Sequence, residues 1–115
     1  MSRFVLKNIN YVIKNGLIHD VKNKTFNQEI VNAQDNFIIK IEYKTFDDIY
    51  VLYHTEVPVR HRGHDLGSLI AQEVFDYLIQ NNTKTNLHCP FLLKFKKKYP
   101  NEKLNIVPVL PKAIK

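Results

Sequence analysis

The residues best placed to do chemistry in this chain lie in the stretch YHTEVPVRHRGHDLGS, residues Tyr53–Ser68. This stretch is typical of a strand that ends at a proline, followed by a short basic turn and the first turn of a helix. Arg60 and Arg62 bring positive charge to the turn, and Gly63 and Gly67 keep side chains out of it. The first N–H groups of a helix lack partners and carry roughly half a positive charge, so they can seat an anion. The order of strand, phosphate-sized turn and helix predicts a nucleotide-type ligand.

Length and composition fit one globular domain. The chain has 115 residues, 44% of them hydrophobic and 24% charged, which is enough for a core of its own. A single cysteine excludes an internal disulfide framework and is typical of a reducing compartment, so a cytoplasmic location is expected. There is no run of about 18 apolar residues, so no membrane span is expected. The net charge of +6 favours an anionic partner, which could be a phosphorylated cofactor, a nucleic acid, an acidic protein or a membrane surface.

The N-terminal residues are basic and leave several interpretations open. The first 19 residues contain three basic residues and no acid, a slight likeness to a mitochondrial presequence. They are rich in Asn and Ile and poor in Ser, Ala and Arg, so a mitochondrial location is only the alternative to a cytoplasmic one. Residues 1–16 are expected to form a basic arm, either loose, or with a strand at Tyr11–Lys14, or as a short helix. Residues 17–110 then form the compact domain and residues 111–115 a tail.

Apolar patterns predict a run of strands before the helices. The expected strands are Leu17–Val21, Thr25–Val31, Phe37–Tyr43 and Ile49–Val57, with turns at Lys22–Lys24, Asn32–Asn36 and Thr45–Asp48. Such short connections predict an antiparallel meander. Pro58 ends the last strand, and apolar residues spaced i, i+3/i+4 predict a helix from about His64 to Gln80. Lys84–Cys89 returns as a strand parallel to Ile49–Val57. A second helix at Phe91–Tyr99 and a last short strand at Lys103–Leu110 complete the domain.

Two separate motifs resemble those of a known family. HTEVP at His54–Pro58, RG at Arg62–Gly63, Gly67, and CPF at Cys89–Phe91 resemble the GNAT acetyltransferases, and in particular their compact Yjdj-type N-acetyltransferase subgroup. The resemblance covers roughly Leu17 to Pro100. It implies an α/β (α+β) fold with a mixed, mostly antiparallel sheet and one parallel pair around a strand, glycine turn and helix. Only the five residues Asn32–Asn36 stand where larger relatives insert two helices, which implies an open acceptor site.

The resemblance implies an acetyl-CoA-dependent N-acetyltransferase that moves an acetyl group to an amine. The implied partners are acetyl-CoA or CoA and an amine acceptor, either a small molecule or a protein, with no membrane or nucleic acid. A monomer or weak dimer is expected. The pantetheine arm of the cofactor would pair with Glu56–Val57, where the parallel strands separate. The residues expected to bind the cofactor are Val57, Arg60, Arg62, Gly63, His64, Asp65, Leu66, Gly67 and Ser68.

Three residues are candidates for catalysis, and each has an alternative structural role. The resemblance gives His54 an acid–base or carbonyl-orienting role, although a half-buried structural histidine is the alternative. Glu56 lies on the same strand face and would act as a general base, unless it is a solvated carboxylate. Cys89 would be an acyl-accepting nucleophile, unless it is a small core residue; His88 beside it faces the opposite way. The spacing of the histidines matches no compact metal motif, so no metal is expected.

The chain departs from the family pattern at two positions. Asp65 stands where the family's turn has glycine. Asp adopts a positive φ less readily than glycine, and at about 4 Å its carboxylate would repel a pyrophosphate by roughly 1–4 kcal/mol. Phe95 stands where relatives often have tyrosine and cannot donate a proton, and Tyr99 is a weak substitute. Asp65 keeps open an alternative function, a non-catalytic CoA- or protein-binding module on the same fold. A nucleic-acid-binding domain is less favoured, because no signature of one accompanies the charge.

Overall fold

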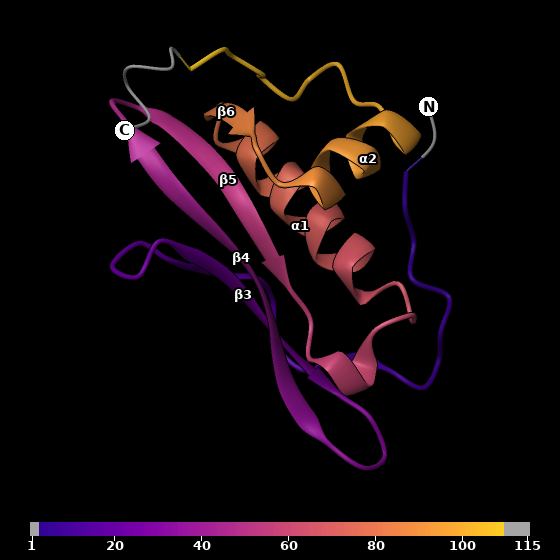
Figure 1. The fold of residues 1–115 in the computed structure, drawn as a ribbon. Helices are drawn as coiled ribbons and strands as arrows, with labels where there is room; N and C mark the ends of the chain where they lie inside the picture. The colour runs from indigo at the N-terminus through magenta and orange to yellow at the C-terminus, as the bar shows by residue number, and fades with distance from the viewer. Residues whose placement is uncertain (1–2, 110–115) are drawn as a thin grey trace.

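The computed structural model describes residues 3–109, which form one six-stranded sheet and two α-helices (Figure 1). The strands are β1 (Val12–Ile13), β2 (Ile18–Asp20), β3 (Thr25–Val31), β4 (Asn36–Phe46), β5 (Ile49–Glu56) and β6 (Lys84–Leu87). The helices are the 3₁₀ turn η1 (Val59–His61), α1 (Leu66–Gln80) and α2 (Pro90–Lys98). The sheet order is β1-β3-β4-β5-β6, with β2 also paired to β3. Strand β6 is parallel to β5, and the other pairs are antiparallel.

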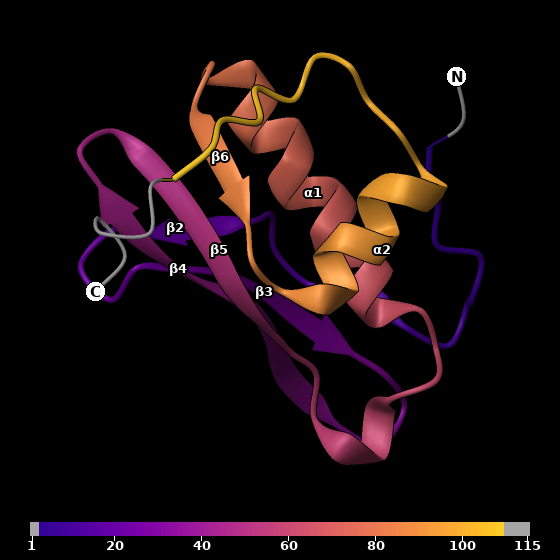
Figure 2. The ribbon, with the colours of Figure 1, turned by 45° about the horizontal axis from the view of Figure 1, so that its top comes forward.

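Helices α1 and α2 cover the same face of the sheet (Figures 1 and 2). Ile39 and Ile41 alternate along β4 toward that face, and both are fully buried. On α1, the four-residue spacing of Ile70, Val74 and Leu78 puts three fully buried side chains on one stripe. Each such side chain contributes about 1.5–3 kcal/mol when it leaves water, so this interface holds the helix on the sheet. None of the helices in residues 3–109 has both the length and the apolar character needed to cross a membrane.

The sheet is disturbed at the C-terminal half of β5, on both edges of that strand. The β4–β5 ladder shifts register between Glu42 and Tyr43, so Tyr53 is skipped by the pairing. On the other edge, β6 pairs with β5 only as far as Leu52. The N–H groups of His88 and Cys89 both donate to the carbonyl oxygen of Leu52, at 2.9 and 3.1 Å. The parallel strands therefore separate after Leu52, as the resemblance implied, and the end of β5 is left with a free edge on the β6 side.

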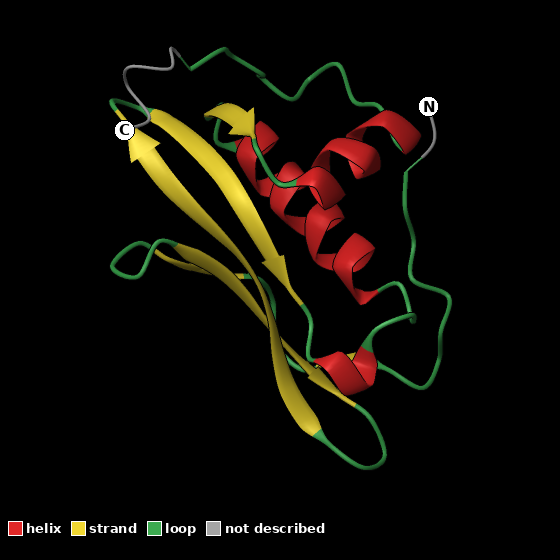
Figure 3. Ribbon diagram, in the orientation of Figure 1, coloured by secondary structure: helices red, strands yellow, loops and turns green. Residues whose placement is uncertain are grey.

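The predicted fold class is confirmed, and most elements form close to their predicted positions (Figure 3). Thr25–Val31 has the predicted bounds, whereas β4 runs on to Phe46 and shortens the following turn to two residues. Helix α1 begins at Leu66 rather than His64, because Asp65 takes a left-handed conformation. The predicted last strand is wrong within the described residues, since only Ile106 makes a single bridge, to Thr85. Residue 110 and the predicted tail at 111–115 lie outside the described residues.

Residues 3–16, here called the N-terminal segment, run in extended form along the helices and past the turn before α1 (Figure 1). The ring of Phe4 contacts Phe95 and Tyr99 edge-on, with centroid distances of 6.3 and 5.9 Å. The guanidinium of Arg3 pairs with the carboxylate of Asp76 on α1 at 2.9 Å. Of the three conformations left open by the sequence, the structure has an extended segment with one short strand, β1, which pairs with β3.

Candidate active site

A cavity of about 370 Å³ opens at the N-terminus of α1. Its lining residues are Thr55, Val57, His61, Arg62, Gly63, Asp65, Leu66, Gly67, Ser68 and Phe91. Seven of these were expected from the sequence to bind the cofactor. The cavity joins the turn after β5 to the free edge of that strand at Thr55. The structure therefore places the predicted phosphate-binding turn and the separated strands on one continuous surface.

The turn and the first residues of α1 offer unpaired backbone donors. Within the described residues, no N–H group from Gly63 to Ser68 has a hydrogen-bond acceptor, and the first paired amide is that of Leu69, which donates to Asp65 at 3.0 Å. Gly63 has a φ of 85° and Asp65 a φ of 65°, so two left-handed residues shape the turn. Such a concave set of N–H groups at a helix N-terminus binds anions, phosphates in particular.

Gly67 and Phe91 form a close-packed wall of this cavity. A Cβ atom built on Gly67 would lie 2.9 Å from Cζ of Phe91, closer than such atoms approach in proteins. Any side chain at this position would displace the end of the Phe91 ring, which is 39% exposed and can turn toward solvent. Glycine at position 67 thus allows the ring to lie against the first turn of α1. The backbone dihedrals of Gly67 are helical, so no left-handed conformation requires glycine here.

The basic residues of the turn have separate positions. Arg62 lines the cavity, and its Nε donates to the carbonyl oxygen of Val57 at 3.0 Å. Arg60 does not line the cavity; its Nε donates to Asp35 Oδ2 at 2.9 Å instead. The ring of His64 lies 5.3 Å from that of Tyr11, in a groove beside the N-terminal segment. Of the predicted cofactor residues, Arg60 and His64 are thus the two that the structure does not bring to the cavity.

His54 and Glu56 share one face of β5, as strand alternation predicts, but it is the outer face of the sheet. Both side chains are 51% exposed, and the imidazole Nε2 lies 3.8 Å from Glu56 Oε1. Glu42, opposite His54 on β4, adds a carboxylate oxygen at 3.9 Å. These three groups could surround a metal ion. However, the ammonium of Lys40 already lies within 4.0 Å of both carboxylates and offsets their charge.

Cys89 lies at the separation of the parallel strands, on the opposite face from His54. It is 5% exposed and directly precedes α2, where its carbonyl oxygen accepts from Leu93 N. Its Sγ lies 3.5 Å from Oγ1 of Thr55, which lines the cavity. The neighbouring His88 is exposed. The thiol therefore does not line the cavity, but it contacts Thr55, which does.

Sequence reasoning missed three residues that line the cavity: Thr55, His61 and Phe91. Thr55 lies between His54 and Glu56, and strand alternation places it on the other face, so the same rule would have found it. Phe91 belongs to the CPF motif, in which only the cysteine was a predicted site residue. His61 stands in the basic turn, where its charge was expected at most to offset that of Asp65, and its contacts with Tyr11 and Asp35 join residues distant in the sequence.

Three features occur together here: a bulged strand β5, a parallel pair that separates, and unpaired N–H groups at the start of the following helix. This combination is that of an acyl-CoA-dependent acyltransferase fold. Residues 29–105 match the sequence profile of the GCN5-related N-acetyl-transferase family. The chain belongs to this family.

Three named relatives show the extent of the similarity. The chain is 31% identical to Protein NATD1 of Danio rerio over 86 residues, which is 72% of this chain and 74% of the relative. Protein NATD1 of Xenopus tropicalis is 31% identical over 85 residues, 71% of this chain and 74% of the relative. Protein NATD1 of Homo sapiens is 28% identical over 82 residues, 71% of this chain and 72% of the relative.

Proposed function

We propose that this protein is an acetyl-CoA-dependent N-acetyltransferase that acts on an amine, and that it belongs to the compact Yjdj-type subgroup of its family. One observation carries the proposal: the unpaired N–H groups of residues 63–68 open onto the same cavity as Thr55, beside the separated strands. Proteins of this family generally use acetyl-CoA. The compact hairpin between β3 and β4, in place of inserted helices, supports the subgroup.

The residues present fit the cofactor. The amides of Gly63–Ser68 would bind its pyrophosphate, with the guanidinium of Arg62 adding a positive charge at the same cavity. The end of β5 at Glu56 and the following Val57 would pair with the amide-containing pantetheine arm on the side that β6 leaves open, although the carbonyl oxygen of Val57 already accepts from Nε of Arg62 at 3.0 Å. When bound, acetyl-CoA supplies a thioester whose carbonyl is attacked by an amine.

The outer face of β5 supplies groups that can handle the proton of an amine. A protonated amine is not a nucleophile, so a base must remove a proton before or during the attack. His54 and Glu56 lie 3.8 Å apart on this face, and either of them could accept the proton. An amine that reaches the free edge of β5 from the outer face would meet these groups. The role of Cys89 as an acyl acceptor is the competing route, and Thr55 Oγ1 is the group that orients its thiol.

Calorimetric titration tests the proposal first. Acetyl-CoA and CoA are titrated separately into the purified protein, with ATP as the control for unspecific binding of a nucleotide. We expect micromolar affinity for both CoA species and at least tenfold weaker binding of ATP. A screen of amine acceptors then measures release of free CoA thiol. No binding of acetyl-CoA at about millimolar concentration would contradict the proposal.

A second candidate function is favoured by one observation. The carboxylate-bearing residue Asp65 lines the cavity at the expected pyrophosphate position. A chain that lost CoA binding through this residue would be a non-catalytic module that binds a protein partner. Restoration of binding by Asp65→Gly in a wild type that binds no CoA would support this second function over the first.

A further inference from the structure

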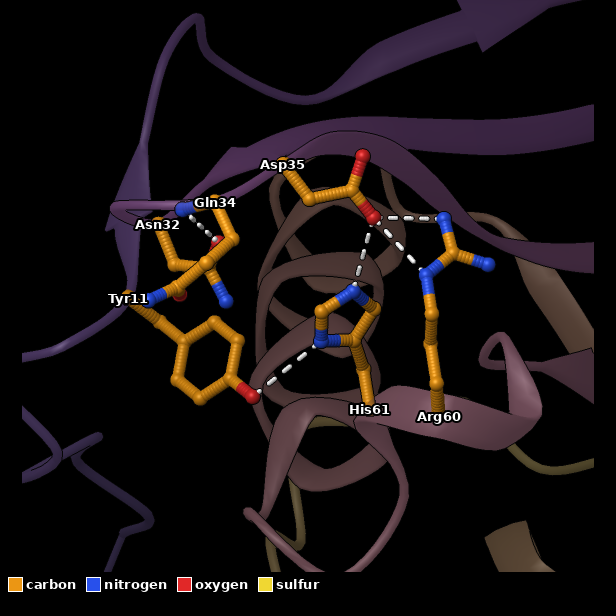
Figure 4. A network of polar contacts seen from close by, with 6 residues as sticks. All are labelled: Tyr11, Asn32, Gln34, Asp35, Arg60 and His61. Atoms are coloured by element: carbon orange, nitrogen blue, oxygen red, sulfur yellow. Dashed lines mark hydrogen bonds and ion pairs between the residues drawn. The ribbon is translucent and has the colours of Figure 1, made fainter.

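A buried histidine ties the anion-binding turn to two distant parts of the chain (Figure 4). His61 closes the η1 turn and is 6% exposed. Its ring stacks on Phe37 of β4, with centroids 3.8 Å apart and planes inclined by only 7°. Both ring nitrogens have partners, so the imidazole can neither rotate nor shift without losing contacts. The same side chain lines the proposed cofactor cavity.

The first partner is a carboxylate on the hairpin between β3 and β4. Oδ2 of Asp35 lies 3.0 Å from Nε2 of His61 and accepts from Nε of Arg60 at 2.9 Å. These two contacts, first with His61 and then with Arg60, lower the pKa of Asp35 below its ordinary value. Asp35 is therefore a charged acceptor that is hydrogen-bonded to two consecutive residues of η1, Arg60 and His61.

The second partner comes from the N-terminal segment. The hydroxyl of Tyr11 lies 3.2 Å from Nδ1 of His61. With the proton on Nε2 donated to Oδ2 of Asp35, Nδ1 accepts from the tyrosine hydroxyl, so both nitrogens of the His61 ring have partners. Figure 4 shows the side chains of Tyr11 and Asp35 meeting the His61 ring from two separate segments.

The turn that follows η1, residues 62–65, has few backbone hydrogen bonds of its own. Among contacts within residues 3–109, the only backbone amide from Arg62 to Asp65 with an acceptor is that of Arg62, which donates to the carbonyl oxygen of Val59 at 3.2 Å. Two of these residues have positive φ. A segment with so few internal bonds keeps one conformation only if its ends are fixed, at α1 on one side and at His61 on the other.

We propose that His61, held by Asp35 and Tyr11, is a positioning residue that keeps the turn 62–65 in its anion-binding form, so that the hairpin and the N-terminal segment set the affinity for the acetyl donor. The inference rests on the proposed function. It assigns to residues outside the glycine turn a share in donor binding. It also explains why Arg60, although basic, does not face the cavity: its guanidinium helps to hold Asp35 in place.

Three variants test the proposal, each measured for its acetyl-CoA Kd by calorimetry and for its Tm. Asp35→Asn removes the charge, Tyr11→Phe removes one hydroxyl, and His61→Phe keeps the stack on Phe37 but loses both hydrogen bonds. We expect the Kd to rise about tenfold in Asp35→Asn and His61→Phe and about threefold in Tyr11→Phe. Asp35→Glu should restore part of the loss. In the acyl-transfer assay the KM for acetyl-CoA should rise with the Kd while kcat and the acceptor KM stay unchanged.

His19→Phe is the matched control. His19 also sits between two partners, Tyr43 Oη at 2.6 Å and Tyr77 Oη at 2.8 Å, but it does not line the cavity. This variant should lower the Tm and leave the Kd within twofold. If the acetyl-CoA Kd of Asp35→Asn stays within twofold of the wild-type value, the inference is overturned, even if the Tm of the variant falls.

Amide hydrogen exchange without ligand separates this inference from the proposed function. The amides of residues 63–65 should exchange faster in Asp35→Asn than in the wild type, while those in the middle of α1 keep their rates. If the wild type binds no acetyl-CoA but this difference is present, the proposed function fails and the positioning role of His61 stands. Equal exchange in the turn of both proteins would overturn the positioning role. Should His61→Phe fail to fold, Asp35→Asn and Tyr11→Phe give the same answer.

Discussion

The two faces of β5 present different kinds of chemical group. The helix-facing side, with Thr55 and the following turn, presents backbone N–H groups and a hydroxyl to a cavity. The outer side presents His54 and Glu56, half exposed, with a carboxylate and an ammonium nearby. One strand thus offers fixed dipoles on one face and titratable groups on the other. This division suits a reaction in which an anionic donor must be bound and an amine must lose a proton.

The largest effect should come from the outer face. Glu56→Gln combined with His54→Ala removes both proton acceptors, so kcat for acetyl transfer should fall by about 10²-fold or more. The acetyl-CoA Kd should not change, because neither side chain lines the cavity. Lys44→Ala is the control on the same face, since its ammonium lies over the Tyr53 ring at 5.3 Å. If the double variant instead had a raised acetyl-CoA Kd and a normal kcat, the outer face would be the one that binds the donor.

A change on the cavity face should alter the affinity for acetyl-CoA rather than kcat. In Gly67→Val the new side chain meets the Phe91 ring, because even a Cβ would lie 2.9 Å from Cζ. The ring must move into the cavity or away from the turn, so we expect the acetyl-CoA Kd to rise about tenfold while kcat at saturation changes little. Gly16→Ala is the control, since its Cβ would meet nothing within 4 Å. Unchanged binding in Gly67→Val would show that the donor does not use this wall.

A smaller gain in affinity is expected at Asp65. At a separation of about 4 Å in a solvated site its carboxylate would repel a pyrophosphate by about 1 kcal/mol, so removing the charge should lower the acetyl-CoA Kd about fivefold. Asp65→Asn removes the charge and still tolerates the left-handed backbone, with φ of 65°, whereas Asp65→Gly also removes the strain. Equal gains in both variants would assign the effect to charge. A gain in Asp65→Gly alone would assign it to backbone strain, and weaker binding in both would show that the carboxylate assists the donor.

The smallest expected effect concerns the pH dependence of stability, which arises at His19, away from the cavity and the outer face of β5. Burial lowers the pKa of His19 below its ordinary value, and Asp20 opposes this only in part. The unfolded chain therefore binds the proton more readily, and stability falls as the pH drops below about 6.5 through the lower folded value. Urea midpoints at pH 7.5 and 5.5 should show a modest loss for the wild type. His19→Gln should flatten this dependence; an equal loss in that variant would exclude His19 as its source.

Local patterns were enough to predict most of the fold. Thr25–Val31 came out with the predicted bounds because turn-forming residues flank it on both sides, and alternation is a property of neighbours in sequence. The parallel placement of β6 followed from a helical crossover. The strand predicted at Lys103–Leu110 failed for a different reason. A strand at the edge of a sheet forms only where a neighbouring strand pairs with it over several residues. Here the pairing is limited to a single bridge, between Thr85 and Ile106.

The candidate site was predictable where it is contiguous in sequence. The turn at Gly63–Ser68 is one motif, so its residues were found together and they line one cavity, apart from His64. Arg60 was expected to face the cofactor because its charge and position fit. Its partner Asp35 lies 25 residues earlier in a hairpin, which no local rule connects to the turn. The position of His54 on the outer face follows from the bulge at Tyr53 of β5, where the pairing with β4 skips one residue, another non-local feature.

The contacts of the N-terminal segment also bear on how the molecule folds. Arg3 with Asp76, Phe4 with Gln72 and Tyr11 with His61 join residues that are 73, 68 and 50 positions apart. Contacts of such long range require large loops to close, which makes them slow to form. On the ribosome, the first residues to emerge must wait until α1 has been synthesised before they meet their partners. In refolding experiments, the capacity to bind an anion at the turn should therefore arise after the β3–β4–β5 meander has formed.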